Sequence, residues 1–265
     1  MLQSINQMTN SKNPLSILYL IFLPLHVGIL LMPFITTFTM LNLFYFLMGY
    51  ILISGLGNNV GLHRWAGHRA VELGKYSKNI VLYFSIMACQ GHPIWWSAVH
   101  RGQHHKFSDT DKDSHSPVNG KWQAFFGWEL KHDPSTVNYK YAVDLMRDPL
   151  LVKTSKYYEV IIITSWIIVG LISVDLLLWM FVLPTVLALH LEGMVNLFCH
   201  SNYGYRNFDT KDNSHNIILL GLLDWGNGWH NNHHAQASIY DFGSGISGKW
   251  WEFDPCRIFK PFLKL

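Results

Sequence analysis

The sequence predicts an all-α integral membrane protein, with four transmembrane helices in two hairpins and a cytosolic helical cap. Three observations favour this fold class: a low share of charged residues, two long apolar blocks, and histidine clusters that follow those blocks. Of the 265 residues 49% are hydrophobic and only 14% are charged, whereas soluble domains carry about 25% charged residues. The composition therefore indicates a chain that is solvated partly by lipid.

The first apolar block runs from Asn13 to Leu62 and contains no Asp, Glu, Lys or Arg. A helix needs about 20 apolar residues to cross a bilayer, so this block is long enough for two spans. We expect spans at 15–33 and 36–56, joined by a tight turn near Met32-Pro33. The length of the block argues strongly against a single buried helix of a soluble protein.

The second apolar block is split by Asp175, and we expect spans over 156–174 and 176–197. Charge inside a membrane is costly and usually functional, so the carboxylates of this block make a buried soluble helix a stronger alternative here. The stretch 76–98 holds an apolar run that is too short to cross a bilayer. We expect it to lie at the membrane interface or to pack beneath the bundle.

The 20 Lys and Arg residues avoid both hairpin turns. They comprise Lys12 and residues within 64–156 and 206–264. Because cytoplasmic segments are enriched in Lys and Arg, we expect both turns to face outward and both chain ends to be cytoplasmic. The prediction is one domain over 1–265, whose cytosolic cap comprises 63–155 and 199–265. The net charge of +3 is too small and too scattered to indicate a nucleic-acid partner.

Nine of the 15 histidines form three boxes and one single position. The boxes are HRWAGH (His63, His68), HRGQHH (His100, His104, His105) and HNNHH (His230, His233, His234), and the single position is His200. All of them follow apolar segments on the same expected face of the membrane. This convergence predicts a metal site on the cytoplasmic side.

The spacing within the boxes supports metal ligation. Positions i, i+3 and i+4 of a helix share one face, so the third box is expected to point into one cavity. In the second box His100 and His104 share a face, while His105 is rotated by about 100°. His63 and His68 diverge by about 140° on an ideal helix, which suits two adjacent ions better than one. Nine imidazoles would give four or five nitrogens to each of two ions, and imidazole suits Zn, Cu, Fe and Ni alike.

Together these motifs resemble the membrane fatty acyl desaturases, the stearoyl desaturase-like family of bacterial type with an all-histidine di-iron centre. The family pattern is HxxxxH, Hxx(x)HH and HxxHH, with an NxxxH motif near the end of the fourth span. The three boxes and the segment NLFCH at 196–200 match this pattern. Further similar segments are GYR (204–206), DNSHN (212–216), GWHNNHHA (228–235) and WWEFDP (250–255). The resemblance covers residues from about 15 to 255.

The resemblance implies a bundle of four membrane helices under a cytosolic cap, with two iron ions held by the nine histidines. Asn196 would hold a water near one of the ions. The implied reaction uses O2 and a reductant to place a cis double bond, most often at Δ9, in a saturated acyl chain. The chain would be carried as an acyl-lipid or as acyl-CoA.

The sequence departs from the family pattern at four places. The second box has one residue more than the HxxHH of similar chains, which makes His100 a less secure ligand than the pair that follows it. Asn227 stands where Glu is frequent, and Gly193 stands where Trp is common. Ala98 replaces an Arg typical of animal acyl-CoA members, which favours an acyl-lipid substrate or a different CoA contact.

Three residues are candidates for supporting the metal ligands from behind, namely Glu192, Asn227 and His115. Glu192, Asn196 and His200 are spaced four apart, so they form one stripe that faces the site. Glu192 is expected to support a ligand or to be an extra ligand, and the alternative is a helix-end carboxylate paired with a base. His115 stands where the family has an Asp-Pro-His segment.

The other histidines and the acidic loop are expected to have no metal. The histidines predicted to be packing or interfacial residues are His26, His92, His132, His190 and His215. The acidic loop, with Asp109, Asp111 and Asp113, lacks the Gly and Glu of an EF-hand, so it is predicted to be a solvated loop.

Two other functions fit the histidines less well. A hydroxylase on the same di-iron scaffold would share the first steps of the reaction, and the histidines do not separate the two. A membrane metal transporter places its polar ligands at mid-membrane, whereas these histidines lie at the ends of spans.

The electrons are expected to come from an external donor, a ferredoxin or a cytochrome b5-type protein. The three cysteines form no CxxC pair, and no flavin fingerprint occurs in the sequence. The basic region 64–156 could attract an acidic electron carrier.

Overall fold

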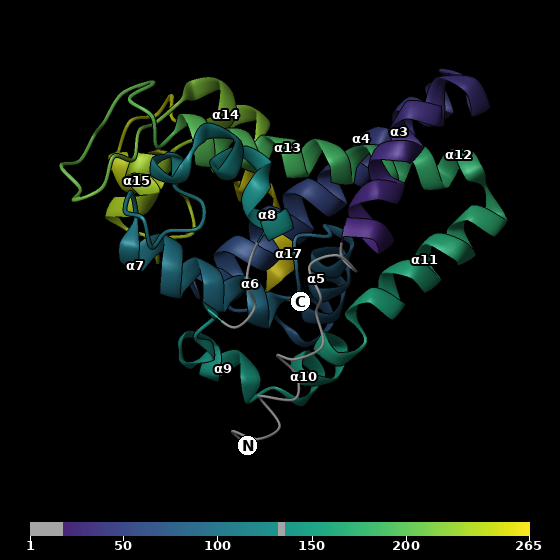
Figure 1. The fold of residues 1–265 in the computed structure, drawn as a ribbon, viewed down its shortest axis with the longest axis horizontal. Coiled ribbons are helices and arrows are strands. Elements are labelled where there is room, and N and C mark those ends of the chain that lie inside the picture. The colour runs from purple at the N-terminus through teal and green to yellow at the C-terminus, as the bar shows by residue number, and fades with distance from the viewer. Residues whose placement is uncertain (1–17, 132–135) are drawn as a thin grey trace.

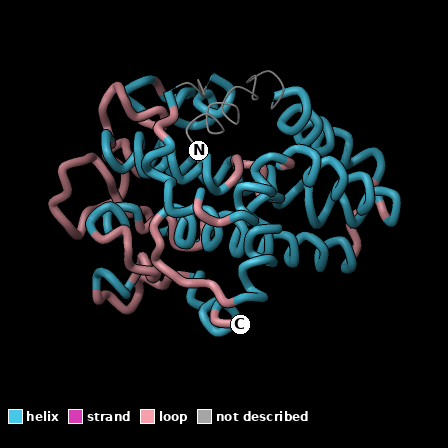
Figure 2. The backbone as a smooth tube through the Cα atoms, turned by 90° about the horizontal axis from the view of Figure 1, so that it is seen from below, coloured by secondary structure: helices cyan, strands magenta, loops and turns pink. Residues whose placement is uncertain are grey.

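The computed structural model describes residues 18–131 and 136–265. Within these ranges the chain is helical and contains no β-strand, as the tube of helices and loops in Figure 2 shows. Isolated bridges join Asn216 to Tyr205 and to Trp229. The predicted all-α class is confirmed for the described residues.

The first hairpin consists of two helical segments joined by residues 36–39. Its elements are the π-helix η1 (Leu18–Phe22), α3 (Leu23–Ile35), α4 (Met40–Gly49) and the π-helix η2 (Tyr50–Gly67). The turn was predicted near Met32-Pro33 and lies later, because Pro33 is accommodated inside α3. The break is set by Thr39, which is extended and whose side-chain oxygen accepts a hydrogen bond from the Asn42 N–H at 3.0 Å.

The second hairpin turns at Ser173, beside the predicted split at Asp175. Its elements are α10 (Pro149–Lys156), α11 (Tyr158–Ile172), α12 (Val174–Leu176), the π-helix η8 (Leu177–Val182) and α13 (Leu183–Phe198). Ser173 is extended, and its side chain accepts a hydrogen bond from the Leu176 N–H at 3.2 Å, which starts the returning helix.

Within the described residues, two helices are long and apolar enough to cross a membrane, Met40–Gly67 with 28 residues and Val174–Phe198 with 25. Helices α10 and α11 are bent by 70° relative to each other, and they make a third candidate span if they are counted as one helix. The apolar helix Leu20–Ile35 is shorter than these spans. Large apolar side chains are exposed on these helices, with Phe34 and Leu171 both 84% exposed. Exposed apolar surface of this kind marks contact with lipid or protein.

The helices α5 (Lys75–Met87) and α6 (Pro93–Val99) form from the apolar run 76–98, and neither is among the helices long and apolar enough to cross a membrane. Helix α5 packs closely against η2, because Gly57 has no side chain to hold the backbones apart. The Ser85 hydroxyl donates a hydrogen bond to the Gly57 carbonyl at 2.9 Å, so the contact has both packing and polar components.

The remaining elements are short and surround the ends of the long helices. They are η3 (His100–His104), α7 (His105–Phe107), η4 (Pro117–Asn119), η5 (Gln123–Gly127), α8 (Trp128–Lys131), η7 (Tyr139–Ala142), α9 (Val143–Met146), α14 (Ile218–Leu223), α15 (His230–Ala235), α16 (Ser244–Ser247), η9 (Pro255–Phe259) and α17 (Lys260–Leu263). In Figure 1, α7 and α15 lie at one side of the molecule, and the tips of α11 and α12 lie at the other. A side chain at Gly193 would collide with the Phe125 carbonyl, so the close packing of η5 on α13 explains the glycine there.

The described histidines outside the boxes make packing contacts, as predicted. His26 and His190 approach each other, with 3.3 Å between their Nε2 atoms. His92 contacts the Thr154 hydroxyl at 2.9 Å, and His215 contacts the Asn213 carbonyl at 2.7 Å. His132 lies outside the described residues.

Gly57→Ala is expected to destabilise the protein by about 1–3 kcal/mol, because the added methyl group overpacks the contact between η2 and α5. The measurement is the thermal unfolding midpoint of the purified protein in detergent. Gly170→Ala is the matched control, since a Cβ there meets only the Leu177 side chain, at 3.2 Å. Equal midpoints for the two variants would contradict this account of the packing.

Candidate metal centre

The eight histidines of the three boxes and the single His200 come together at the ends of the helices. They form two adjacent groups. Group one consists of His63, His68, His100, His105 and His233, and group two consists of His104, His200, His230 and His234. Within each group the candidate ligand atoms lie within 4.8 Å of one another. The predicted division of nine nitrogens into five and four is therefore present in the geometry.

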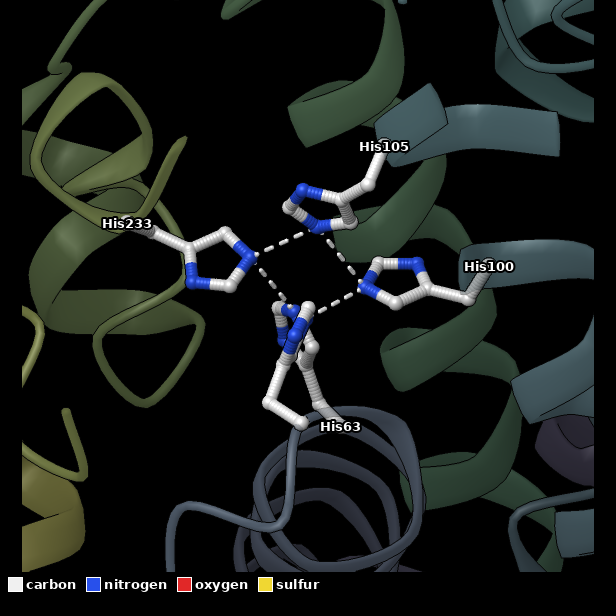
Figure 3. Close-up of side chains that lie close together, drawn as sticks. His63, His100, His105 and His233 are labelled. Atoms are coloured by element: carbon white, nitrogen blue, oxygen red, sulfur yellow. Dashed lines mark hydrogen bonds between the residues drawn. The ribbon is translucent and has the colours of Figure 1, made fainter. Parts of the chain in front are cut away.

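In group one the Nε2 atoms point toward a common centre, as Figure 3 shows for four of the five rings. The Nε2 of His233 lies 3.0 Å from that of His63 and 3.1 Å from that of His105. The Nε2 of His100 lies 2.7 Å from that of His68 and 3.1 Å from that of His105. Side chains from three separate segments thus present the same ring atom to one point.

The prediction that His63 and His68 diverge toward two ions is wrong. Helix η2 is a π-helix, and it ends with a hydrogen bond of 3.1 Å from the His68 N–H to the His63 carbonyl. In such i→i+5 geometry five residues make about one turn, whereas they overshoot one turn of an α-helix. The two rings therefore belong to the same group.

The second box divides differently from the prediction, which paired His100 with His104. It begins in the short π-helix η3, where the His105 N–H donates to the His100 carbonyl. The π-turn places His100 and His105 together in group one and directs His104 into group two. The extra residue of this box is therefore absorbed by a π-turn, and all three of its histidines stay in the site.

The third box also serves both groups instead of one cavity. It forms the short helix α15, on which His230 and His234 are four residues apart and both belong to group two. His233 points to group one. The adjacent groups are thus joined through a single helical turn.

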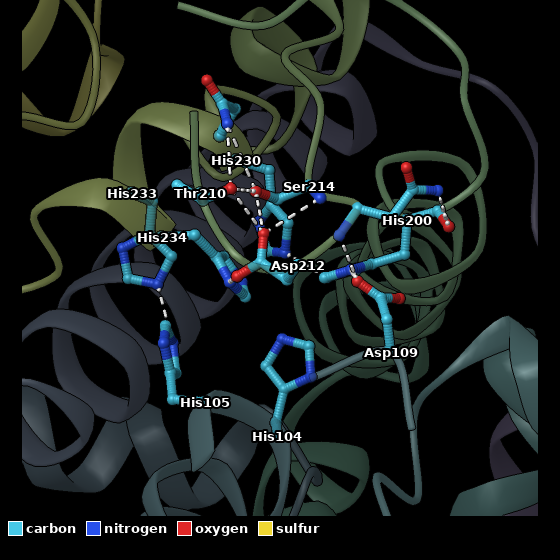
Figure 4. A network of polar contacts seen from close by, with 12 residues as sticks. His104, His105, Asp109, His200, Thr210, Asp212, Ser214, His230, His233 and His234 are labelled. Carbon is cyan, nitrogen blue, oxygen red and sulfur yellow. Dashed lines mark hydrogen bonds and ion pairs between the residues drawn. The ribbon is translucent and has the colours of Figure 1, made fainter. Parts of the chain in front are cut away.

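Group two is supported from outside by three carboxylates, part of which Figure 4 shows. These contacts, each from a histidine Nδ1 to a carboxylate oxygen, are His104–Asp113 at 3.0 Å, His200–Asp109 at 3.0 Å and His234–Asp212 at 2.8 Å. The fourth ring, His230, has its Nδ1 3.2 Å from the Asn227 backbone carbonyl. A partner at Nδ1 fixes the ring and leaves Nε2 free to bind a metal.

The solvated-loop prediction for the acidic segment is wrong for two of its three aspartates. Asp113 is fully buried and Asp109 is half-buried against His200, and only Asp111 is exposed. The prediction tested the segment only as a calcium site. Alternating acids shortly after the second histidine box were the available signal for Asp109 and Asp113, and Asp212 opens the DNSHN segment that resembles the family.

The pairs His104–Asp113 and His234–Asp212 affect the pKa values of both partners. Burial raises the pKa of Asp113, but His104 outweighs burial and holds that pKa well below its usual range. Burial likewise opposes ionisation of Asp212, yet His234 and nearby hydroxyls keep its pKa low. Burial lowers the pKa of His234 to about 4 despite its carboxylate partner. The aspartates are therefore ionised at neutral pH.

The group-one histidines outside the membrane helix stay neutral. Burial, followed by the neighbouring imidazoles and by Arg101 near His68, lowers their pKa values well below the usual range. These residues are His68, His100, His105 and His233. Neutral rings have lone pairs available for a metal.

The donor set fits first-row metal ions. Ligand nitrogens at right angles and about 2.1 Å from one ion lie about 3 Å apart, close to the separations in group one. The His234 Nε2 atom is buried and has no hydrogen-bond partner, although it faces three other imidazoles. A buried ring nitrogen without a partner is costly, and a bound cation would satisfy it.

Asn227, which was predicted to support a ligand, contacts the His63 ring. Its Oδ1 lies 2.8 Å from the His63 Nδ1, and its Nδ2 donates to Glu192 at 2.6 Å. Glu192 also accepts a hydrogen bond from Asn58 at 2.5 Å. The hydrogen-bond partners of Glu192 are thus amides and not a base, and its path to the histidines runs through Asn227.

His115 lies behind His104. Its Nδ1 is 3.8 Å from the Asp113 carboxylate, and its ring centre is 5.1 Å from that of His104. The Asp113 carboxylate therefore lies near both rings, with one oxygen toward each.

A small cavity of about 30 Å³ touches both groups. Its lining includes His100 from group one, His230 from group two, and the polar side chains of Glu192 and Asn196. This volume exceeds the roughly 10–15 Å³ that a cavity needs to hold a water. The cavity therefore has room for one small molecule beside both groups.

The segment that carries the third box is fixed to the end of η2 by a buried ion pair. The Arg64 side chain, adjacent to His63, donates to the Asp254 carboxylate at 2.8 Å, and both side chains are fully buried. Arg64 also donates to the Tyr240 carbonyl at 2.8 Å and to the Trp225 carbonyl at 3.1 Å. This arrangement gives the WWEFDP segment a structural role next to the histidines.

Comparison with known proteins shows one family throughout. A sequence profile described as fatty acid desaturase matches residues 36–242. The chain is 34% identical over 241 residues to the sn-1 stearoyl-lipid 9-desaturase of Anabaena variabilis, covering 89% of this chain and 85% of the other. It is 30% identical over 249 residues to the acyl-CoA C20 Delta5-desaturase of Anemone leveillei, covering 91% and 77%. It is 32% identical over 240 residues to the hex-5-enoyl-acyl-carrier protein acetylenase of Moorena producens, covering 78% and 70%.

Asp254→Asn is expected to cost about 3–5 kcal/mol of folding stability, because Arg64 is left as a buried charge without its carboxylate. The thermal unfolding midpoint in detergent measures the loss. Lys78→Gln is the control, since Lys78 pairs with Asp148 in a partly exposed position, where a lost pair costs about 1 kcal/mol or less. A midpoint for Asp254→Asn no lower than that of the control would contradict the proposed anchoring.

Proposed function

Because the chain belongs to the fatty acid desaturase family, oxidoreductases that act on paired donors with O2, we propose that it places a cis double bond in a saturated acyl chain. One hydrogen leaves each of two adjacent carbons. With O2, two electrons and two protons, the products are the alkene and two molecules of water. The observation that carries the proposal is the convergence of nine buried or half-buried imidazoles in groups of five and four.

The proposed cofactor is a pair of iron ions, one held by group one and one by group two. An unactivated C–H bond has no acidity for a general base to exploit, so redox-active iron supplies the O2 chemistry when it is bound. The chain contributes the ligands, the dry surroundings and their orientation. Asn196, which lines the cavity shared by both groups, is proposed to hold a water near one ion.

The substrate is proposed to be an acyl-lipid or acyl-CoA, with the double bond most often at Δ9. Support comes from the Anabaena variabilis relative, whose name specifies a stearoyl-lipid and position 9. The Anemone leveillei relative is named for acyl-CoA and position 5, so the family supports both carriers and more than one position. Ala98, in place of a cationic side chain, favours the lipid or a different contact with CoA.

The membrane arrangement is proposed to have four spans, with the histidine groups and both chain ends on the cytoplasmic side. The long apolar helices and the exposed side chains at the hairpin tips support insertion from that end. The distribution of Lys and Arg, which avoids both hairpin turns, supports the orientation.

Expression in a host that lacks unsaturated fatty acids tests the reaction. The expected result is a cis-monounsaturated product whose double-bond position is located by mass spectrometry. His104→Ala is the inactive comparison, because it removes a nitrogen from group two. A hydroxylated fatty acid in place of the alkene would favour the hydroxylase alternative and overturn the desaturase.

The electron donor is proposed to be an acidic ferredoxin or cytochrome b5-type protein that docks on the basic region 64–156. The rate of reduction by a purified acidic ferredoxin is expected to fall when the ionic strength rises from about 0.01 to 0.15 M. Over that range the screening length shortens from about 30 to 8 Å. A rate that does not change with salt would exclude electrostatic docking.

A further inference from the structure

The two histidine groups differ in the charge that lies behind them. Three of the four group-two rings have an aspartate oxygen at Nδ1, within 2.8–3.0 Å. Among the described contacts, no group-one ring has a carboxylate at Nδ1, and His63 has the neutral amide of Asn227 there instead. The Nδ1 of His233 is buried without a hydrogen-bond partner.

Group one also has cations nearby. The Arg64 guanidinium lies over the Phe242 ring at 3.9 Å, and that ring packs on His233 at 4.2 Å between centres. Arg101 donates at 2.5 Å to the carbonyl of Gly67, the residue before His68. Arg64 is paired with Asp254, and Arg101 shares Asp144 with Arg69. The carboxylates of Glu192 and Asp224 reach His63 only through the Asn227 amide.

The group-two carboxylates also fix the loops around them. The Asp109 oxygen that contacts His200 accepts a second hydrogen bond from the Asn213 N–H at 2.6 Å. Asp212 accepts hydrogen bonds from Thr210 and Ser214, at 2.8 and 2.5 Å from its other oxygen. The carboxylates behind His200 and His234 are therefore themselves held in place by hydrogen bonds from residues 210–214.

A carboxylate behind an imidazole raises the basicity of the ligand and orients its ring, and its loss lowers metal affinity by about 10–100-fold. Three negative charges close to one site also offset the charge of a divalent ion directly. Group one offers one more nitrogen than group two but neither of these contributions.

We propose that the two metal positions are unequal, with group two binding Fe²⁺ more tightly than group one, so that group two fills first and empties last. This inference rests on the proposed function, which supplies the two iron ions. Asp109, Asp113 and Asp212 are the positioning residues of the tighter site.

The test is a chelator titration of the full-length protein in lipid nanodiscs after loading with Fe²⁺, with iron per chain measured by elemental analysis. The wild-type protein is expected to lose its iron in two steps of one ion each. His68→Ala removes a group-one nitrogen, so only the tightly held ion should remain. His230→Ala removes a group-two nitrogen, so only the weakly held ion should remain.

Asp113→Asn and Asp212→Asn are expected to shift the step of the tightly held ion by about 10-fold toward lower chelator and to leave the other step in place. Asp111→Asn is the matched control, because Asp111 is exposed in the same loop. Retention of the unshifted step shows that a variant is folded, and the two aspartates are tested independently.

Two iron ions lost in a single step, or aspartate variants that release iron like Asp111→Asn, would overturn the inequality and leave the proposed function intact. A wild-type protein that binds no iron would overturn the proposed function itself.

Discussion

The site depends on i→i+5 hydrogen bonding at the ends of η2 and η3, where two boxes each place a pair of histidines five residues apart. In an α-helix such pairs diverge, and no single ion could use both. The π-turn at His63–His68 and the similar turn at His100–His105 return each pair to one side. Both turns close group one, and His104 is thereby left to group two. Helix type thus decides which nitrogens meet.

Nine imidazoles gathered in a buried site would repel one another if they were protonated. The structure adjusts their pKa values in two ways. Burial and mutual repulsion keep most rings neutral, which suits metal binding. Burial lowers the pKa of His104, but the surrounding aspartates, Asp113 foremost, raise that pKa overall. The acidic loop is therefore part of the candidate metal centre, and the chain between the hairpins shapes its electrostatics.

Hydrophobicity and charge were sufficient to predict the helical hairpins, because span length follows directly from bilayer thickness. The break beside Asp175 was predictable, while the first turn followed a threonine cap in place of the more conspicuous Pro33. The nine histidines were predictable as a set from their motifs. Their division into groups was not, since it depends on π-turns that no hydropathy pattern encodes.

The residues that lie behind the histidines show the same limit of prediction from sequence. Asn227 could be found because it departs from a family motif, whereas the role of Asp113 required knowledge of how its loop folds back onto His104. A short acidic loop reads as solvated unless a cationic or metal-binding cluster lies within reach. Here the cluster precedes the loop by only a few residues, so the same segment that provides the ligand His104 also provides the carboxylate behind it. For His104 the supporting acid is nine residues away, whereas Asp109 lies 91 residues from His200 and Asp212 lies 22 residues from His234. Only the first of these contacts is local in sequence.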